Sequence, residues 1–235
     1  MSIADNLLKY KNELSAIDVQ LVAVSKTQPV GLIEEAYAAG QRIFGENLVQ
    51  EMADKYEQLP KDIEWHLIGH LQTNKVKYIA PFVKLIHAVD SLRLLTEINK
   101  QALKHNRVID CLLQIYIADE ETKFGLGFDE AIDLLRSETF ASLANVRIAG
   151  VMGIATNTKN PKQIKAEFYE LRTFFKGLKE SFFRDADYFR EISMGMSDDY
   201  KIAIEEGSTM VRIGSSIFGK RNIKPRQEGV NQENK

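Results

Sequence analysis

The chain has 235 residues, and its hydrophobic content of 44% is typical of a folded chain with a full core. With 31 basic against 33 acidic residues the formal net charge is −2, so bulk electrostatics favour neither nucleic acid nor an anionic membrane as a partner. No apolar run approaches the roughly 18 residues of a membrane span, and the single cysteine, Cys111, excludes internal disulfides and thiolate metal sites.

The first predicted element lies at the N-terminus, where residues 1–14 (MSIADNLLKYKNEL) have the pattern of an amphipathic helix. This segment lacks the charged and apolar regions of a signal peptide. Together with the cysteine usage, it leads us to expect a cytoplasmic protein.

The next element is an apolar, β-branched run over 21–25 that leads into Lys26 and is halted by Pro29. Because the run shows no apolar/polar alternation, it predicts a parallel strand buried on both faces. Lys26 then lies where the strand leaves the core and opens toward a ligand site. A desolvated lysine there can lose its proton and attack an aldehyde to form a Schiff base. The alternative is that Lys26 only marks the solvated end of the strand.

Short apolar runs alternate with helical patterns along the whole chain. The eight predicted strands cover 21–25, 42–44, 64–68, 83–88, 110–117, 146–154, 189–192 and 209–213. Eight strand–helix units in a chain of this length predict an α/β fold, a single (β/α)8 TIM-like barrel with an N-terminal helix, and a doubly wound open sheet is the alternative. Ser91 and Pro161 are predicted to start two of the helices. Since no Pro/Gly/Ser-rich linker divides the chain, we expect one domain over 1–221 and a flexible polar tail over 222–235.

Polar residues follow the second predicted strand, in the segment 44–47 (FGEN) and then at Gln50 and Glu51. Asn47 comes directly after this strand, so its amide could reach a ligand bound at the strand ends. The alternative is that Asn47 only caps the next helix.

His66 lies within the third predicted strand, where a lone histidine most often satisfies a hydrogen bond in the core. His66 and His70 have helical spacing, but Gly69 and the strand pattern spoil that geometry, which argues against a metal site. Gly125 and Gly127 lack the third glycine of a dinucleotide-binding fingerprint.

Two segments rich in small residues follow the last two predicted strands, at 193–199 (SMGMSDD) and 207–216 (GSTMVRIGSS). Small residues let backbone N–H groups approach a ligand anion, and in barrels the loops after strands seven and eight are the usual phosphate-binding place. Ser215 and Ser216 are expected at the start of a helical turn, where free N–H groups favour phosphate. Ser197 also suits the N-cap of a helix over 198–206.

Arg212 lies inside the apolar run of the last predicted strand. A guanidinium in a buried strand is costly unless it is paired or bonded to a ligand. Arg212 is therefore either bound to a carboxylate inside the barrel or directed at a ligand beside Lys26.

With these residues in view, the sequence resembles the pyridoxal phosphate homeostasis protein family, whose members are similar to the fold-type III barrel of alanine racemase. The resemblance spans nearly the whole chain and is carried by the following blocks in order: AVSKTQP, FGENLVQE, WHLIGHLQTNK, HAVDS, ETKFGLG and SMGMSDDYKIAIEEGSTMVRIGSSIFG.

The resemblance implies a site for pyridoxal 5′-phosphate (PLP), with Lys26 carrying the cofactor as a covalent internal aldimine. The implied cofactor-binding residues are Lys26, Asn47, Ser193, Met196, Ser197, Arg212, Gly214 and Ser215. Four of these, namely Ser193, Ser197, Gly214 and Ser215, are expected around the phosphate. Arg212 is expected to face the pyridine nitrogen, Asn47 to lie beside the ring, and Met196 to border the cofactor through its backbone.

The sequence departs from the family at two places. Ile115 and Tyr116 stand where the family often has Val-Asn, and Phe124 stands where it commonly has Ser. These departures weaken any assignment of a role to that loop and leave the expected cofactor residues untouched. The roles of His66, Tyr116 and Phe124 stay open.

The implied chemistry favours cofactor handling over turnover. An arginine at the pyridine nitrogen disfavours its protonation and so weakens the ring as an electron sink. A racemase also needs a second acid/base on the opposite face of the ring, which alanine racemases take from a C-terminal β-domain, and this chain ends about where such a domain would begin. We therefore expect a monomeric protein of intracellular vitamin B6 balance that holds PLP without robust catalysis and delivers it to PLP-dependent apo-enzymes. The alternatives are a minimal amino-acid racemase, with Lys26 on one face and His66 or Tyr116 on the other, and a regulator that senses PLP.

Overall fold

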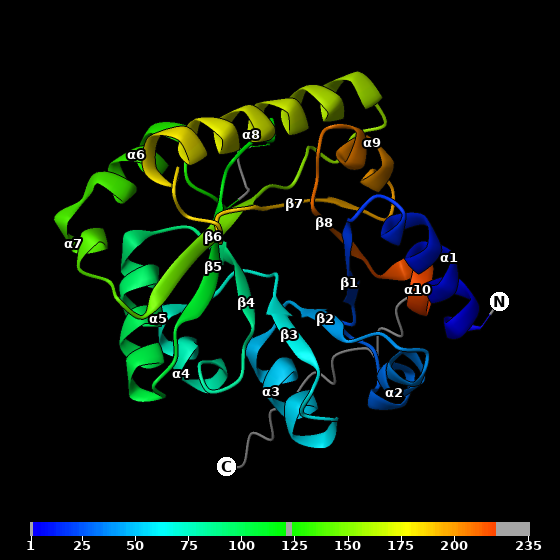
Figure 1. Cartoon of the computed structure of the whole chain (residues 1–235). Helices are drawn as coiled ribbons and strands as arrows, with labels where there is room; N and C mark the ends of the chain where they lie inside the picture. The colour runs from blue at the N-terminus through cyan, green and yellow to red at the C-terminus, as the bar shows by residue number, and fades with distance from the viewer. Residues whose placement is uncertain (1, 121–123, 220–235) are drawn as a thin grey trace, which may run out of the picture.

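A closed barrel of eight parallel strands organises the chain (Figure 1). The computed structural model describes residues 2–120 and 124–219, so the predicted tail over 222–235 lies outside the described residues. The strands are β1 (Gln20–Val24), β2 (Ile43–Glu46), β3 (Glu64–Leu67), β4 (Leu85–Val89), β5 (Ile109–Gln114), β6 (Val146–Met152), β7 (Glu191–Met196) and β8 (Met210–Ile213). Each strand pairs with its neighbour in sequence, and β1 closes the barrel on β8 with Ala23 opposite Ile213. The predicted (β/α)8 barrel is confirmed.

Helices surround this barrel on its outer face (Figure 1). They are α1 (Ile3–Ser15), α2 (Val30–Ala38), α3 (Val49–Gln58), the 3₁₀ turn η1 (Thr73–Lys75), α4 (Val76–Ile79), α5 (Leu92–Lys104), α6 (Phe128–Arg136), α7 (Glu138–Ala141), α8 (Pro161–Phe182), α9 (Tyr200–Glu205) and α10 (Ser215–Phe218). The predicted N-terminal helix is α1. Ser91 caps α5 by accepting the N–H of Leu94, and Pro161 occupies the first turn of α8, both as predicted.

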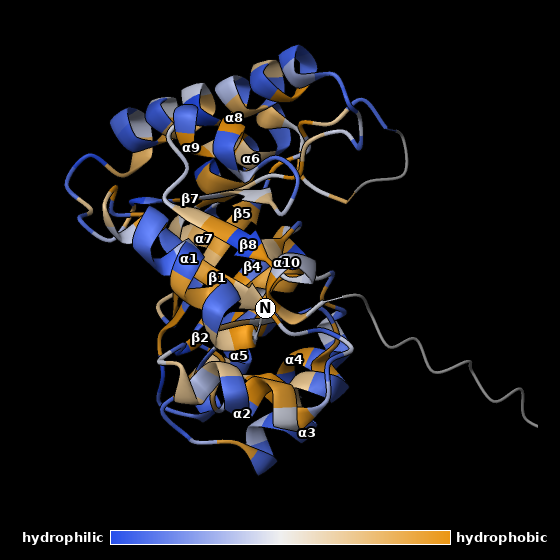
Figure 2. Cartoon of the chain, turned by 90° about the vertical axis from the view of Figure 1, so that its right-hand side faces the viewer, coloured by the Kyte–Doolittle hydropathy of each residue, from blue (hydrophilic) through white to orange (hydrophobic). Residues whose placement is uncertain are grey.

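The core has two parts, because each strand is covered on both of its faces. Outside the barrel, strand and helix side chains form one large cluster, and Figure 2 shows mostly apolar strands beneath helices of mixed polarity. Inside the barrel, a smaller apolar cluster fills the axis with Val22, Leu85, Ala88, Leu112, Ala149, Met152 and Met210. Burial on both faces explains why the strands lack apolar/polar alternation.

The helix predicted over 198–206 is shorter in the structure, and Ser197 does not cap it. It begins at Tyr200, with Asp199 as N-cap residue, and the C-cap residue is followed by Gly207 at φ +88°. The Asp199 carboxylate instead accepts the N–H of Met196 at 2.5 Å, and its own N–H donates to the Met196 carbonyl. This turn delays the helix and leaves Ser197 beside the barrel mouth.

Among the described residues, no helix is both long and apolar enough to cross a bilayer.

Candidate functional site

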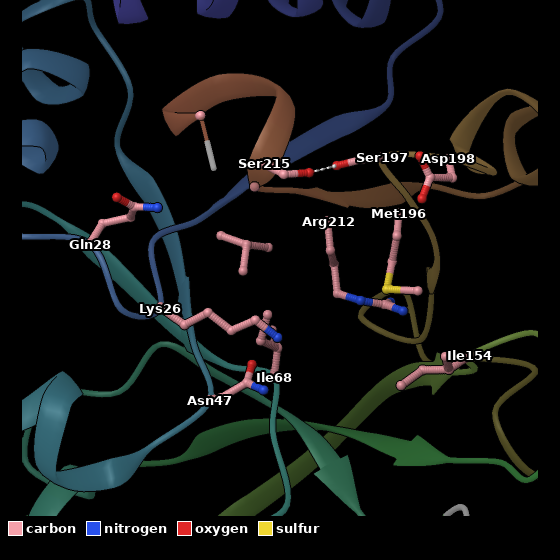
Figure 3. A pocket seen from close by; sticks show the side chains of 13 residues that line it. Lys26, Gln28, Asn47, Ile68, Ile154, Met196, Ser197, Asp198, Arg212 and Ser215 are labelled. Atoms are coloured by element: carbon pink, nitrogen blue, oxygen red, sulfur yellow. Dashed lines mark hydrogen bonds between the residues drawn. The ribbon is translucent and has the colours of Figure 1, made fainter. Parts of the chain in front are cut away.

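Lys26 lies at the carboxyl-end mouth of the barrel, just past the end of β1. Its half-buried side chain extends into a cavity of about 290 Å³ (Figure 3). The cavity is lined by Val24, Lys26, Gln28, Asn47, Ile68, Ile154, Met196, Ser197, Asp198, Arg212, Gly214, Ser215 and Gly219. Seven of the eight residues predicted for a binding site therefore line one cavity, and Ser193 is the exception.

Arg212 forms the wall across the cavity from Lys26 (Figure 3). Only 4% of it is exposed, and it donates to Oγ of Ser193 at 2.6 Å and to the carbonyl of Gly153 at 3.0 Å. Burial lowers the pKa of Arg212 to about 10, and the nearby Asp199 carboxylate acts in the opposite direction. Arg212 is therefore a fixed cation at neutral pH, and its hydrogen bonds go to neutral oxygens.

Ser193 connects Arg212 to two histidines in the barrel interior. Its hydroxyl lies 2.9 Å from Nδ1 of His87, and Nε2 of His87 lies 3.1 Å from Nδ1 of His66. Burial lowers the pKa of His66 to about 3, and it lowers that of His87 well below its usual value. His66 thus has the core hydrogen bond that the sequence suggested, and it pairs with His87 and not with His70. Sequence reasoning missed His87, whose only local signal was a polar residue in an apolar strand.

A polar corner of the cavity combines the two small-residue segments. The hydroxyls of Ser197 and Ser215, which come from the ends of β7 and β8, lie 3.4 Å apart. Gly214 passes so close to β1 that a Cβ atom there would lie 2.9 Å from the Val24 carbonyl oxygen. The side chain of Met196 also lines the cavity, while its N–H is held by Asp199.

Asn47 follows β2 and lines the cavity beside Lys26 (Figure 3). It does not cap α3, whose N-cap residue is Leu48. Asn47 therefore lines the cavity and does not serve as a helix cap.

Several lining residues were not singled out from the sequence. Gln28 follows Lys26 in the same loop, Ile68 and Ile154 lie beyond the ends of β3 and β6, and Asp198 lies in the turn after β7. Their common signal is their place directly after a strand, since all parallel strands of a barrel end at the same mouth.

An adjoining cavity of about 300 Å³ shares Asn47, Ile68 and Ile154 with the first. Its lining includes the residues that depart from the family pattern, namely Ile115, Tyr116 and Phe124. The Tyr116 hydroxyl donates to the Glu120 carbonyl at 2.5 Å, and Phe124, which is 57% exposed, stacks on His70 with ring centroids 4.2 Å apart.

Comparison with known proteins identifies relatives over nearly the full length. The family model described as alanine racemase, N-terminal domain, matches residues 1–222. The pyridoxal phosphate homeostasis protein of Aquifex aeolicus (strain VF5) is 43% identical over 204 residues, covering 86% of this chain and 87% of that protein. The protein of the same name from Escherichia coli (strain K12) is 38% identical over 234 residues, covering 94% and 97%. The structure of PipY from Synechococcus elongatus PCC7942 with PLP bound is similar, with a TM-score of 0.82, 37% identity, and coverage of 93% of this chain and all of that chain.

Proposed function

Because this chain belongs to the family of the alanine racemase N-terminal domain, we propose that it binds PLP and serves in intracellular PLP homeostasis. The observation that carries this proposal is the placement of the Lys26 amine and the buried Arg212 guanidinium on facing walls of one cavity. Two relatives named pyridoxal phosphate homeostasis protein, at 43% and 38% identity, support the physiological role.

The lining residues fit the three functional groups of PLP, which are an aldehyde, a pyridine nitrogen and a phosphate. Lys26 supplies an amine for the aldehyde. Arg212 can only donate hydrogen bonds, so a nitrogen facing it must be an acceptor and stays unprotonated. The hydroxyls of Ser197 and Ser215 supply hydrogen-bond donors for the phosphate, and Gly214 supplies the close backbone approach.

We infer a covalent attachment of the cofactor to this chain. Lys26 would hold the cofactor through its amine, because the cofactor would supply an aldehyde and a lysine amine can form a Schiff base with that group. When bound, the cofactor supplies an electron-accepting ring, which the unprotonated pyridine nitrogen makes a weak one. Ser193 was expected to contact the phosphate. We propose instead that it positions Arg212, because its hydroxyl accepts a hydrogen bond from the guanidinium inside the barrel.

The racemase alternative loses one of its two candidate second bases. His66 lies inside the barrel, hydrogen-bonded to His87, and is not part of the cavity wall around Lys26. Tyr116 belongs to the adjoining cavity, and its hydroxyl donates to a backbone carbonyl. These positions favour cofactor binding over racemisation. We propose that the chain stores PLP and delivers it to PLP-dependent apo-enzymes, as a monomer in the cytoplasm.

Covalent binding is tested by the visible spectrum of the purified protein with PLP, before and after borohydride reduction, followed by mass mapping of the modified lysine. We expect an absorbance band of the lysine-bound cofactor and a reduced adduct on Lys26 that Lys26→Ala abolishes. Lys61→Ala is the control, because that lysine lies on the exposed surface. A band that survives in Lys26→Ala would overturn the proposal.

Turnover is tested separately by deuterium exchange at Cα across a panel of amino acids. We expect no robust exchange that depends on Lys26. Exchange that Lys26→Ala and Tyr116→Phe both abolish would instead establish the racemase.

A further inference from the structure

Three charged residues, two of them buried, contact the chain on both sides of Lys26, and none of them lines the cavity proposed to bind the cofactor. They are Glu46 at the end of β2 and Glu51 and Lys55 on α3, and we call these three residues the clamp. Glu46 is fully buried and Lys55 is 5% exposed. Burying such charges is costly unless each is paired and hydrogen-bonded.

Lys55 is the centre of the clamp. Its ammonium donates to Oε1 of Glu46 at 2.7 Å, to Oε1 of Glu51 at 2.7 Å and to the carbonyl oxygen of Ser25 at 2.8 Å. An ammonium group has three N–H donors, so these three acceptors use all of them and fix its position.

The clamp holds the chain on both sides of Lys26. On the preceding side, the Ser25 hydroxyl donates to Oε1 of Glu46 at 2.6 Å, and the Ser25 carbonyl accepts from Lys55. On the following side, the Thr27 N–H donates to Oε1 of Glu51 at 2.6 Å. The chain on both sides of Lys26 is thus tied to the Lys55 ammonium. The Ser25 carbonyl binds the ammonium directly, and the Ser25 hydroxyl and the Thr27 N–H are linked to it through the carboxylates of Glu46 and Glu51.

Thr27 shows that this local conformation needs support. Its φ is +64°, in the left-handed region that a β-branched residue rarely adopts. A strained conformation of this kind persists only when surrounding contacts over-determine it. The bond from Thr27 to Glu51 is such a contact.

Stability by itself is a weak explanation for the clamp, because the desolvation of a buried ion pair offsets most of its Coulombic attraction. The cost is visible at Glu46, where burial raises the pKa to about 7 in spite of the neighbouring Lys55, and where Oε2 has no hydrogen-bond partner among the described residues. Fixing one geometry is the better attested use of a buried ion pair.

We propose that Glu46, Glu51 and Lys55 are positioning residues that hold the loop 25–27 so that the Lys26 amine meets the aldehyde of PLP. This inference rests on the proposed function and extends it to residues outside the cavity wall.

The test compares Glu51→Ala with Glu51→Gln, which keeps an oxygen acceptor for the Thr27 N–H and for Lys55. Glu57→Ala is the matched control, since Glu57 lies on the same helix with a 78% exposed side chain. Four quantities are measured: the rate of covalent attachment of PLP to Lys26, the Kd for pyridoxine 5′-phosphate, amide hydrogen exchange at Thr27 without cofactor, and the urea midpoint of unfolding. Pyridoxine 5′-phosphate has the ring and the phosphate but no aldehyde, so its Kd reports on the cavity alone.

We expect Glu51→Ala to slow covalent attachment by about 10- to 100-fold, to speed exchange at Thr27, and to leave the Kd for pyridoxine 5′-phosphate close to that of the wild type. Glu51→Gln should restore most of the attachment rate, and Glu57→Ala should match the wild type. Lys55→Met should slow attachment as Glu51→Ala does. Its urea midpoint measures how much stability the protein loses when the buried cation is removed.

Two results would overturn the positioning role while leaving the proposed function intact. One is a wild-type attachment rate in Glu51→Ala. The other is a Glu51→Ala variant in which slower attachment is fully accounted for by weaker binding of pyridoxine 5′-phosphate and a lower urea midpoint. That result would indicate structural damage only. Absence of any adduct in the wild-type protein would overturn the proposed function, and the clamp role with it.

Discussion

Nε2 of His87 lies 3.1 Å from Nδ1 of His66 inside the barrel, and burial keeps both imidazoles neutral. Arg212 can only donate to Oγ of Ser193, which leaves the Ser193 hydroxyl proton for Nδ1 of His87. His87 then carries its proton on Nε2 and donates to Nδ1 of His66. The reverse direction would leave the Ser193 hydroxyl proton without an acceptor among the described residues.

The first prediction follows from this chain of hydrogen bonds. At pH 6 both His66 and His87 should be neutral and protonated on Nε2, because burial opposes the imidazolium and the bonds fix the tautomer. Long-range ¹⁵N–¹H correlation spectra of the imidazole rings check this. Exposed His105 serves as the internal reference, and titration of either buried ring near its usual pKa of 6.5 would contradict the prediction.

The pH dependence of stability should show two opposing contributions. The depressed pKa values of His66 and His87 contribute stability that is present above an unfolded pKa of about 6.5 and is lost as pH falls. Glu46 has a raised pKa of about 7 against 4.5 when exposed, so the folded state binds its proton more tightly and stability falls as pH rises through that window.

Glu46→Gln removes only the second contribution. Between pH 4.5 and 6.5 the free energy of unfolding of this variant should therefore fall more steeply on acidification than that of the wild type. The difference in slope should be at most about 1.4 kcal/mol per pH unit. Urea unfolding at a series of pH values measures it, and identical slopes would show that Glu46 keeps an ordinary pKa.

Arg212→Ala should weaken PLP retention more than it perturbs folding. The substitution removes the cation that faces Lys26. It takes one donor from Oγ of Ser193 and one from the Gly153 carbonyl, while Ser193 keeps its hydrogen bond to His87. We expect a stability loss of about 1–3 kcal/mol and a larger loss in the binding free energy of PLP. Equilibrium dialysis and urea unfolding measure the two, and equal losses would favour a purely structural cation.

Gly214→Ala should weaken binding of the phosphate end of the cofactor. Its new Cβ would lie 2.9 Å from the Val24 carbonyl, so the backbone between β8 and α10 must shift away from β1. Gly177→Ala is the control, because nothing lies within 4 Å of the added methyl group in the middle of α8.

The control should gain about 0.5–1 kcal/mol of stability and bind pyridoxine 5′-phosphate like the wild type. Gly214→Ala should raise the Kd for the same compound. If both variants bound it equally well, the close approach at Gly214 would have no part in phosphate binding.

Several features of the fold and of the cavity depend on short segments of the sequence. The apolar run before Lys26 and the stop at Pro29 are contained in a few neighbouring residues, and the structure places Lys26 just past β1 as expected. The repeated alternation of strand and helix patterns likewise predicted the barrel, since each unit is a local signal. Because all parallel strands end at one mouth, the cavity shared by Lys26, Arg212 and Gly214 also followed from the sequence.

The hydrogen-bond partners of individual side chains depend on residues far apart in the sequence, so they were harder to predict than the strands. Ser197 had the residue type of a helix cap, but the Asp199 carboxylate satisfies the backbone there and the helix begins later. Ser193 followed the pattern of a phosphate-binding segment, but its hydroxyl turns inward to Arg212. The residue type indicated which groups these hydroxyls can bind. The fold determined which of those groups lie within hydrogen-bond distance.

The sequence by itself determined the eight strand–helix units, the lysine at the end of the first strand and the buried arginine in the last, because strand burial and residue chemistry are properties of short segments. Only the tertiary structure decided which polar groups meet. His87 reaches Ser193 across 106 positions of sequence, and Lys55 reaches Ser25 across 30. The physical reason is that closing the barrel excludes water, and each buried donor or acceptor must then bond to whichever polar group the packing brings within reach.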